Sequence, residues 1–217
     1  MKDKDLTSID IDSEEEYDEE YDESGKSGKT GRKNSKQNAF LKELLIDSVY
    51  LLVVLVLTLL FVRYVAQRTV VDGFSMQPQL QNQDNLIVDK ITYRFKDPQR
   101  FDIVVFPFEY RKNEYYIKRI IGLPGETIQI DEQGNIYING QLLEEHYGAE
   151  VIEEPGRAAL PITLGDDEYF VMGDNRNHSS DSRTTAVGNV SRDEIIGRAW
   201  LRVYPFDQFG LIKYGED

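Results

Sequence analysis

The chain has 217 residues, no cysteine, two histidines and a formal net charge of −14. Without cysteine there are no disulfides, no thiolate chemistry and no cysteine-based zinc sites, and two well-separated histidines form no histidine-rich metal site, so we expect no metal and no cofactor. The charge is local, because residues 1–24 hold twelve acidic and two basic residues. No later stretch interleaves basic and aromatic residues, which argues against nucleic acid as a partner.

Residues 1–37 are predicted to be a disordered tail. They are acidic and then rich in Gly, Ser and Lys, and they hold too few apolar side chains to offset the entropy lost on ordering. Residues 28–30 resemble the end of a phosphate-binding loop, but the first glycine of that motif would fall at Glu23 and no strand is predicted before it. We therefore expect no nucleotide site in the tail.

Residues 38–65 are predicted to form a transmembrane helix that anchors the protein in the cytoplasmic membrane. Residues 44–62 read LLIDSVYLLVVLVLTLLFV, with one charge, and this length suits a hydrocarbon core of about 30 Å. The run is apolar on all sides, without an amphipathic period, and the alternative is a buried helix of a soluble domain. Its long acidic leader and missing cleavage site argue against a removable signal peptide. Basic residues predominate before the run, which predicts a cytoplasmic N-terminus and an extracytoplasmic remainder.

Residues 66–217 are predicted to form one mainly β domain. Short segments rich in β-branched and aromatic residues alternate with turns, which is typical of antiparallel sheets or a partly open barrel. Asn139-Gly140 is the strongest hairpin signal, and one short helical turn is predicted at residues 191–195, with Ser191 as its N-cap and Glu194 three residues on. The predicted strands are residues 85–93, 102–106, 115–121, 127–130, 135–138, 168–172 and 197–203.

Ser75, in the segment GFSMQPQL, is the candidate nucleophile, although a serine in a Gly- and Pro-containing loop is also ordinary turn chemistry. A serine nucleophile needs a base, because an alcohol is weakly nucleophilic at its free pKa. The candidates are His178, in GDNRNHSSDSR, and a lysine buried against apolar groups, whose pKa must fall by roughly three units. Lys118 shares a predicted strand face with Tyr116, and Lys90 is a competitor with a similar pattern; either lysine also suits the edge of a sheet.

Four segments follow one another behind the apolar run: GFSMQPQL, RFDIVVF, YIKRIIGLPGE and GDNRNHSSDSR. They resemble the successive boxes of bacterial type I signal peptidases, also called leader peptidases, and the resemblance covers most of residues 73–183. It implies that Ser75 is the nucleophile and Lys118 the general base of a Ser-Lys dyad. His178 falls where this family needs no catalytic group.

The resemblance also implies supporting roles in the last box. The Ser179 hydroxyl is expected to orient the lysine, Asp181 and Arg183 to brace the site from behind, and Asp174 and Arg176 to belong to the same scaffold. Gly73 resembles the Gram-positive type of the family, because Gram-negative members have at that position a serine that contributes to the oxyanion hole. The backbone N–H of Ser75 is then the expected oxyanion donor, and the second donor stays unassigned.

Two residues depart from the family pattern. Gln79 stands where threonine is usual and Phe101 where glycine is common, and neither touches the dyad. We also expect Phe74, Met76 and Leu80 either to rest against lipid or to pack into the core, with equal weight for the two.

The sequence therefore predicts a membrane-bound serine endopeptidase that removes signal peptides from exported preproteins. Its partners would be the lipid bilayer and preproteins with small-x-small cleavage sites, bound along an extended groove. Two alternatives stay open: a self-cleaving Ser-Lys peptidase of the repressor type, and an inactive membrane-tethered binding module of the same fold.

Overall fold

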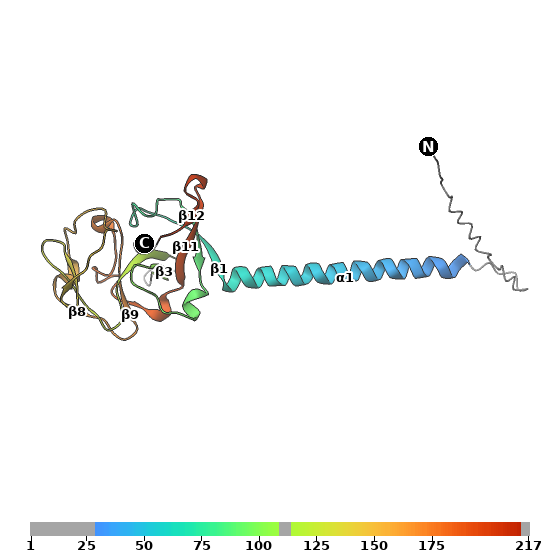
Figure 1. Cartoon of the computed structure of the whole chain (residues 1–217), viewed down its shortest axis with the longest axis horizontal. Helices are drawn as coiled ribbons and strands as arrows, with labels where there is room; N and C mark the ends of the chain where they lie inside the picture. The colour runs from blue at the N-terminus through green and yellow to red at the C-terminus, as the bar shows by residue number, and fades with distance from the viewer. Residues whose placement is uncertain (1–28, 109–113, 214–217) are drawn as a thin grey trace, which may run out of the picture. The chain divides into compact units, whose positions relative to one another are not determined.

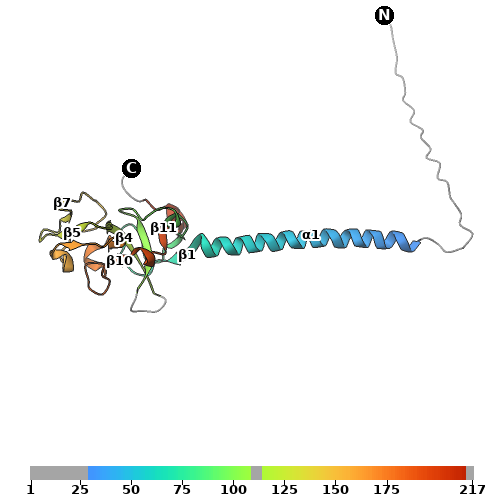
Figure 2. The same cartoon turned by 90° about the horizontal axis from the view of Figure 1, so that it is seen from below.

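The computed structural model describes residues 29–108 and 114–213. The chain divides into two compact units at Leu52 and Val53, within helix α1 (Lys29–Tyr64), and the β-rich part lies wholly in the second unit. Figures 1 and 2 show this part as two sheets, and neighbouring strands in both sheets are antiparallel. The predicted fold class is confirmed.

Within the described residues, one helix is long and apolar enough to cross a membrane. The candidate span is Phe40–Phe61, with a mean hydropathy of 2.7 and no buried side chains. The predicted disorder of residues 29–37 is wrong, because α1 already begins at Lys29. Once the apolar run has nucleated a helix, each further residue adds a backbone hydrogen bond, so the helix extends into the Lys-rich leader. Residues 1–28 lie outside the described residues.

The large sheet has the order β1-β2-β11-β3-β4-β9-β10, and β12 pairs with β11. Its strands are β1 (Ala66–Val70), β2 (Asn85–Asp89), β3 (Ile103–Pro107), β4 (Tyr115–Gly122), β9 (Glu168–Met172), β10 (Val190–Ser191), β11 (Gly197–Tyr204) and β12 (Gly210–Leu211). In β2 the side chains alternate, so Leu86 and Val88 are buried and their neighbours are half-buried.

The small sheet has the order β7-β6-β5-β8 and lies on the β9 side of the large sheet in both views (Figures 1 and 2). Its strands are β5 (Thr127–Ile130), β6 (Ile136–Ile138), β7 (Gln141–Leu142) and β8 (Ile162–Thr163). Asn139 and Gly140 join β6 to β7 with φ of 51° and 79°. The hairpin prediction is confirmed, because such turns need the left-handed region that Asn and Gly tolerate.

Isoleucines of the small sheet pack with Phe170 and Met172 of β9, so one of the three core clusters joins the two sheets. Five 3-10 helices connect strands in the described part of the chain. They are η1 (Thr92–Arg94), η2 (Gly156–Ala159), η3 (Arg176–His178), η4 (Arg192–Glu194) and η5 (Phe206–Gln208).

Two differences from the predicted elements have local causes. The strand expected to reach residue 93 ends at Asp89, because the Asp89 carboxylate accepts the N–H groups of Ile91 and Thr92 and starts η1. Strand β1 was not predicted, because its sequence AQRTV is short and polar and its hydrogen bonds come from β2. The turn at η4 and its capping box between Ser191 and Glu194 are confirmed.

Candidate active site

The loop between β1 and β2 carries Ser75, and its apolar side chains fix it to the large sheet. Met76 is 2% exposed and Leu80 is fully buried, and both pack with Leu86 of β2 and Ile103 of β3. Of the two expected placements, packing into the core is therefore correct for Met76 and Leu80, and of the three residues only Phe74, at 58%, is exposed. Burial of these neighbouring side chains fixes the position of Ser75 relative to the large sheet.

Gly73 lets the chain turn just before the serine. Its φ of 109° lies in the region that only glycine adopts without strain. Its N–H donates to Oδ1 of Asn82 on the far side of the same loop, at 3.0 Å. Within the described residues the N–H of Ser75 donates to no protein acceptor, so it is available for a ligand oxygen.

Lys118 lies on β4, 43 residues after Ser75, and its Nζ is 2.9 Å from Ser75 Oγ. The same Nζ donates to the carbonyl of Ile117 at 3.0 Å. Lys118 is 4% exposed, and burial lowers the pKa of its ammonium to about 8, against the opposing effect of the Asp181 and Asp174 carboxylates. Burial destabilises the charged form, so Lys118 becomes neutral far more readily than a surface lysine.

The Lys118 amine lies beside one ring of an aromatic cluster. The ring of Tyr116, two residues earlier on the same strand, has its centroid 4.9 Å from Nζ. Phe108 stacks on the other side of Tyr116, with ring centroids 4.5 Å apart, and Phe106 packs edge-on at 6.2 Å. This stack restricts Tyr116, which in turn limits where the lysine side chain can go.

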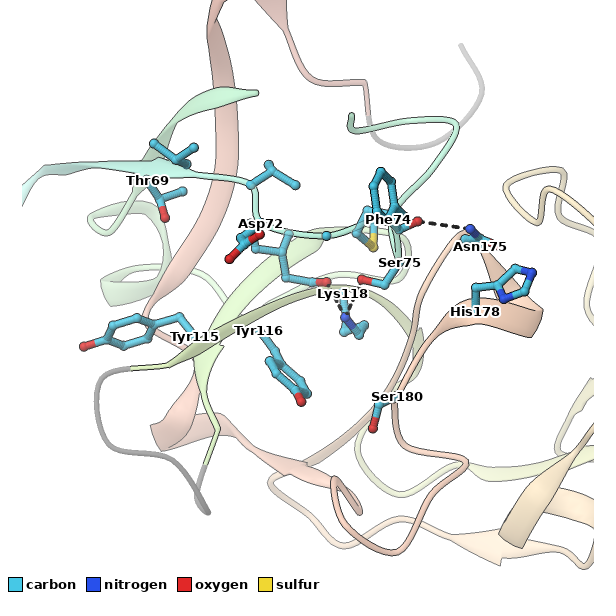
Figure 3. A pocket seen from close by; sticks show the side chains of 15 residues that line it. Thr69, Asp72, Phe74, Ser75, Tyr115, Tyr116, Lys118, Asn175, His178 and Ser180 are labelled. Atoms are coloured by element: carbon cyan, nitrogen blue, oxygen red, sulfur yellow. Dashed lines mark hydrogen bonds between the residues drawn. The ribbon is translucent and has the colours of Figure 1, made fainter. Parts of the chain in front are cut away.

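The loop after β9 holds the serine loop in place by its backbone. Asn175 donates its N–H to the Ser75 carbonyl at 3.0 Å and its side-chain amide to the Phe74 carbonyl at 3.1 Å. Figure 3 shows Asn175 beside the turn that carries Phe74 and Ser75. Gly173 has no room for a side chain, because a Cβ there would lie 2.5 Å from the Ser75 carbonyl oxygen. The two loops therefore depend on each other's backbone.

Two buried ion pairs support this loop from below. Asp174 accepts two hydrogen bonds from Arg119, at 2.8 and 2.7 Å, and both side chains are fully buried. Asp181 pairs with Arg183 at 2.9 Å and also accepts the N–H of Gly173 at 3.0 Å. Arg119 points to the opposite face of β4 from Lys118. The same strand therefore presents the lysine to the cleft and the arginine to the buried ion pair with Asp174.

A third ion pair brings in the segment between β7 and η2. Arg176 pairs with Glu145 at 2.7 Å, and the Arg119 guanidinium lies over the Tyr147 ring, 3.8 Å from its centroid. Phe101 packs against the same ring at 4.9 Å. The segment around residue 147 therefore lies against the scaffold of the site and is not simply solvated.

Three further candidates, Ser179, His178 and Lys90, make no hydrogen bond with Lys118 within the described residues. Ser179 Oγ is buried and makes no hydrogen bond within the described residues, so its predicted contact with Lys118 is not formed in this structure. His178 is exposed and lines the cleft (Figure 3), but the hydrogen bonds of Lys118 go to Ser75 and Ile117. Lys90 donates to Gln67 at 3.1 Å and does not line the cleft.

Asn175, Arg119 and Tyr147 belong to the site but were not predicted as site residues. Asn175 and Arg119 stand inside the quoted motifs, directly beside Asp174 and Lys118, so their position in the motif was an available signal. Tyr147 lies in a polar segment whose pattern gives no sign that it packs under β4. Only tertiary contact reveals it.

Ser75 and Lys118 face an open cleft of about 540 Å³. Its walls come from the end of β1, the serine loop, the start of β4 and the loop after β9. Residues 115–118 of β4 pair with β3 on one side, while the β9 pairing begins only at Arg119. In the part of the chain that the structure describes, the first half of β4 therefore pairs with no strand on the cleft side and offers a free edge there. Within the described residues, no three His, Asp or Glu side chains gather as a metal site would require.

The family model described as signal peptidase, peptidase S26, matches residues 42–204. The chain belongs to this signal peptidase family. The probable signal peptidase I-2 of Synechocystis sp. is 42% identical over 69% of this chain and 68% of its own length. Signal peptidase I of Bacillus amyloliquefaciens is 37% identical over 83% of this chain and 97% of its own, which agrees with the predicted Gram-positive type. A crystal structure of a signal peptidase I from Enterococcus faecalis V583 is 36% identical and covers 48% of this chain and 97% of that one, with a TM-score of 0.39.

Both departures from the signal peptidase pattern now have a structural setting. Phe101 has a φ of 71°, a left-handed conformation that suits the glycine common at this position, and its ring packs against Tyr147. The Gln79 carbonyl accepts a hydrogen bond from Arg202, so this position contributes its backbone to the serine loop.

Proposed function

We propose that this signal peptidase family member is a membrane-anchored serine endopeptidase that cleaves signal peptides from exported preproteins with Ser75 and Lys118. The observation that carries the proposal is the 2.9 Å separation between the serine hydroxyl and a lysine amine that is 4% exposed. A buried amine with its pKa near 8 is a competent general base at the pH of the cell surroundings.

In the first step, neutral Lys118 takes the proton of Ser75 while Oγ attacks the scissile carbonyl carbon. The Ser75 N–H, which has no partner within the described residues, donates to the developing oxyanion. The tetrahedral intermediate collapses as the protonated lysine returns a proton to the leaving amine, which leaves an acyl-enzyme. Lys118 then takes a proton from water, the resulting hydroxide attacks the ester, and Ser75 is restored.

The cleft suits an extended peptide. The free edge at residues 115–118 of β4 offers backbone groups to a substrate strand, so the scissile bond can lie across Ser75. Alternate side chains of such a strand point the same way. The cleft would accept small residues at the first and third positions before the cut, which is the small-x-small pattern of signal peptides.

The anchor is proposed to be the apolar span Phe40–Phe61, in the cytoplasmic membrane. The N-terminus would then be cytoplasmic and the β domain extracytoplasmic, as the distribution of basic residues around the span predicts. Phe74 is exposed on the serine loop, whereas Met76 and Leu80 are buried, so Phe74 is the one of these three residues that can contact lipid.

The test is cleavage of a preprotein peptide with an Ala-x-Ala site by the full chain in detergent. We expect Ser75→Ala and Lys118→Ala to lower kcat/KM by at least about a thousandfold, because neither step proceeds without the nucleophile or the base. Lys90→Ala and His178→Ala are matched controls and should stay within about tenfold of the wild type. Loss of activity in His178→Ala alone would transfer the role of base to His178.

A further inference from the structure

The cleft carries one unpaired carboxylate. Asp72 directly precedes Gly73, is exposed, and lines the same cleft as Ser75 and Lys118. Within residues 29–108 and 114–213 its side chain makes no hydrogen bond and no ion pair. A carboxylate that supports the loop would be expected to accept a nearby N–H, as Asp84 does from Gln81. Asp72 therefore keeps its full hydrogen-bonding capacity for a ligand.

Among the described residues, Asp72 is also the single acidic side chain in the lining of this cleft. The other ionisable groups there are Lys118, which must be neutral to act as base, His178, and the tyrosines Tyr115 and Tyr116. On its own side of Ser75, Asp72 is therefore the one charged group among the described residues of the lining, whereas Lys118, which carries a proton below pH 8, lies beside Ser75 and His178 lies beyond it. Complementary charge in the substrate would be favoured and like charge disfavoured.

The carboxylate lies to one side of the catalytic pair. Figure 3 shows Asp72 and Tyr115 on one side of Ser75 and Lys118, and Asn175 and His178 on the other. An extended peptide advances by about 3.3 Å per residue, so a strand across Ser75 passes Asp72 within a few residues of the scissile bond. It does so on one side of that bond only.

We infer that Asp72 is a specificity-determining residue that favours preproteins with a lysine or arginine a few residues from the cleavage site, on one side of the scissile bond. This inference rests on the proposed function and names a feature of its substrates beyond the small residues. An acidic residue at the same place is disfavoured. Because Asp72 is exposed, its preference is modest and falls as salt screens the charges.

The experiment uses the full chain in detergent and a reference peptide with an Ala-x-Ala site. Lysine, glutamate or glutamine is placed in turn at each of three positions on either side of the scissile bond, apart from the two alanines. At low salt we expect the Lys/Glu ratio of kcat/KM to reach about tenfold at positions on one side and to stay near one on the other. In the wild type the ratio should fall towards one in 1 M NaCl.

The variants separate Asp72 from the general charge of the protein. In Asp72→Asn the ratio should fall to near one, and in Asp72→Lys it should invert. Asp166→Asn removes the same charge from an exposed position outside the cleft and should leave the ratio unchanged. The glutamine peptides report whether each variant is folded and active.

Three outcomes would overturn the inference. They are an equal ratio in the wild type and Asp72→Asn, an equal loss in Asp166→Asn, and a wild-type ratio that is insensitive to salt. If the glutamine peptides are cleaved in these cases, the proposed function stands while the role of Asp72 fails. If the wild type cleaves no peptide of the series, the proposed function itself is contradicted.

Discussion

At the scale of single residues, burial separates Lys118 from the other lysines. Lys90 has a similar strand pattern, but its amine donates to a glutamine side chain, and it follows the end of β2 and does not line the cleft. Lys118 sits among Tyr116, the Ile117 carbonyl and Ser75, with almost no access to water. The loss of hydration lowers the pKa of the amine, and the same loss destabilises the folded protein.

The activity should follow the titration of Lys118. Because the proposed base is the neutral amine and burial lowers its pKa to about 8, kcat/KM is expected to rise about tenfold per pH unit below that value and to level off above it. A pH profile from 6 to 10 with an Ala-x-Ala peptide measures this. An inflection near pH 6.5 would instead indicate a histidine base.

The stability should show the cost of the same burial. Between pH 8 and 10.5 the unfolded chain holds a proton on Lys118 that the folded chain has lost, so this group makes stability rise with pH in that window. Below pH 8 the folded protein bears the full free-energy cost of burying the charged amine. This cost is about 3 kcal/mol for a pKa shift from 10.5 to about 8.

Lys118→Met, which fills similar space without charge, is therefore expected to be inactive but more stable than the wild type at pH 7, by about 1–3 kcal/mol. The gain should shrink as pH rises towards 10.5, and thermal unfolding at several pH values measures it. Lys90→Met, a substitution at a half-buried lysine outside the site, is the control. Equal or lower stability of Lys118→Met at pH 7 would contradict the proposed burial penalty.

At the scale of elements, the site depends on two loops whose backbones are in contact. The serine loop is fixed to the sheet by Met76 and Leu80, and the loop after β9 is fixed by its ion pairs. Asn175 and Gly173 join them where no side chain fits between. The position of Ser75 Oγ is thus set by backbone contacts between segments about a hundred residues apart.

Gly173→Ala tests this contact. Its Cβ would lie 2.3 Å from Ser179 Oγ and 2.5 Å from the Ser75 carbonyl oxygen, so the loops must separate. We expect kcat to fall by at least about a hundredfold, because small misplacements of reacting atoms cost that much, and stability to fall by about 1–3 kcal/mol. Gly210→Ala has nothing within 4 Å and should leave both quantities unchanged. Near-normal kcat in Gly173→Ala would show that the loop contact does not position the serine.

At the scale of the whole molecule, one chain joins a candidate membrane span to a β domain that bears a cleft. The first strand begins at Ala66, five residues after the span ends at Phe61. A connection this short leaves little chain between the bilayer and β1, so the β domain must work close to the membrane surface if Phe40–Phe61 spans it.

The absence of cysteine offers a direct test of orientation. Single cysteines introduced as Ser8→Cys in the N-terminal tail and Asp166→Cys in the β domain can be treated with a membrane-impermeant maleimide in intact cells whose outer barriers are permeable to it. We expect labelling of Asp166→Cys alone, and labelling of both after the membrane is opened. Labelling of Ser8→Cys alone in intact cells would reverse the proposed topology.

Local patterns along the chain were enough for several conclusions. The apolar helix, the strand at β2, the Asn139-Gly140 hairpin and the capping box at Ser191 were all predicted, because each depends on residues within a few positions of one another. The motifs that contain Ser75 and Lys118 were likewise visible, and with them the family.

Only the tertiary structure decided which groups meet. Two lysines carry similar local patterns, and the pairing of β4 with β3 and β9 brings Lys118, but not Lys90, to Ser75 across 43 residues. The burial of Met76 and Leu80, the extension of the helix to Lys29, the packing of Tyr147 under Arg119 and the free carboxylate of Asp72 also became visible only there. The reason is physical: a short stretch of sequence determines its own backbone preference and its apolar face, whereas burial, pKa and contact depend on segments that are distant along the chain.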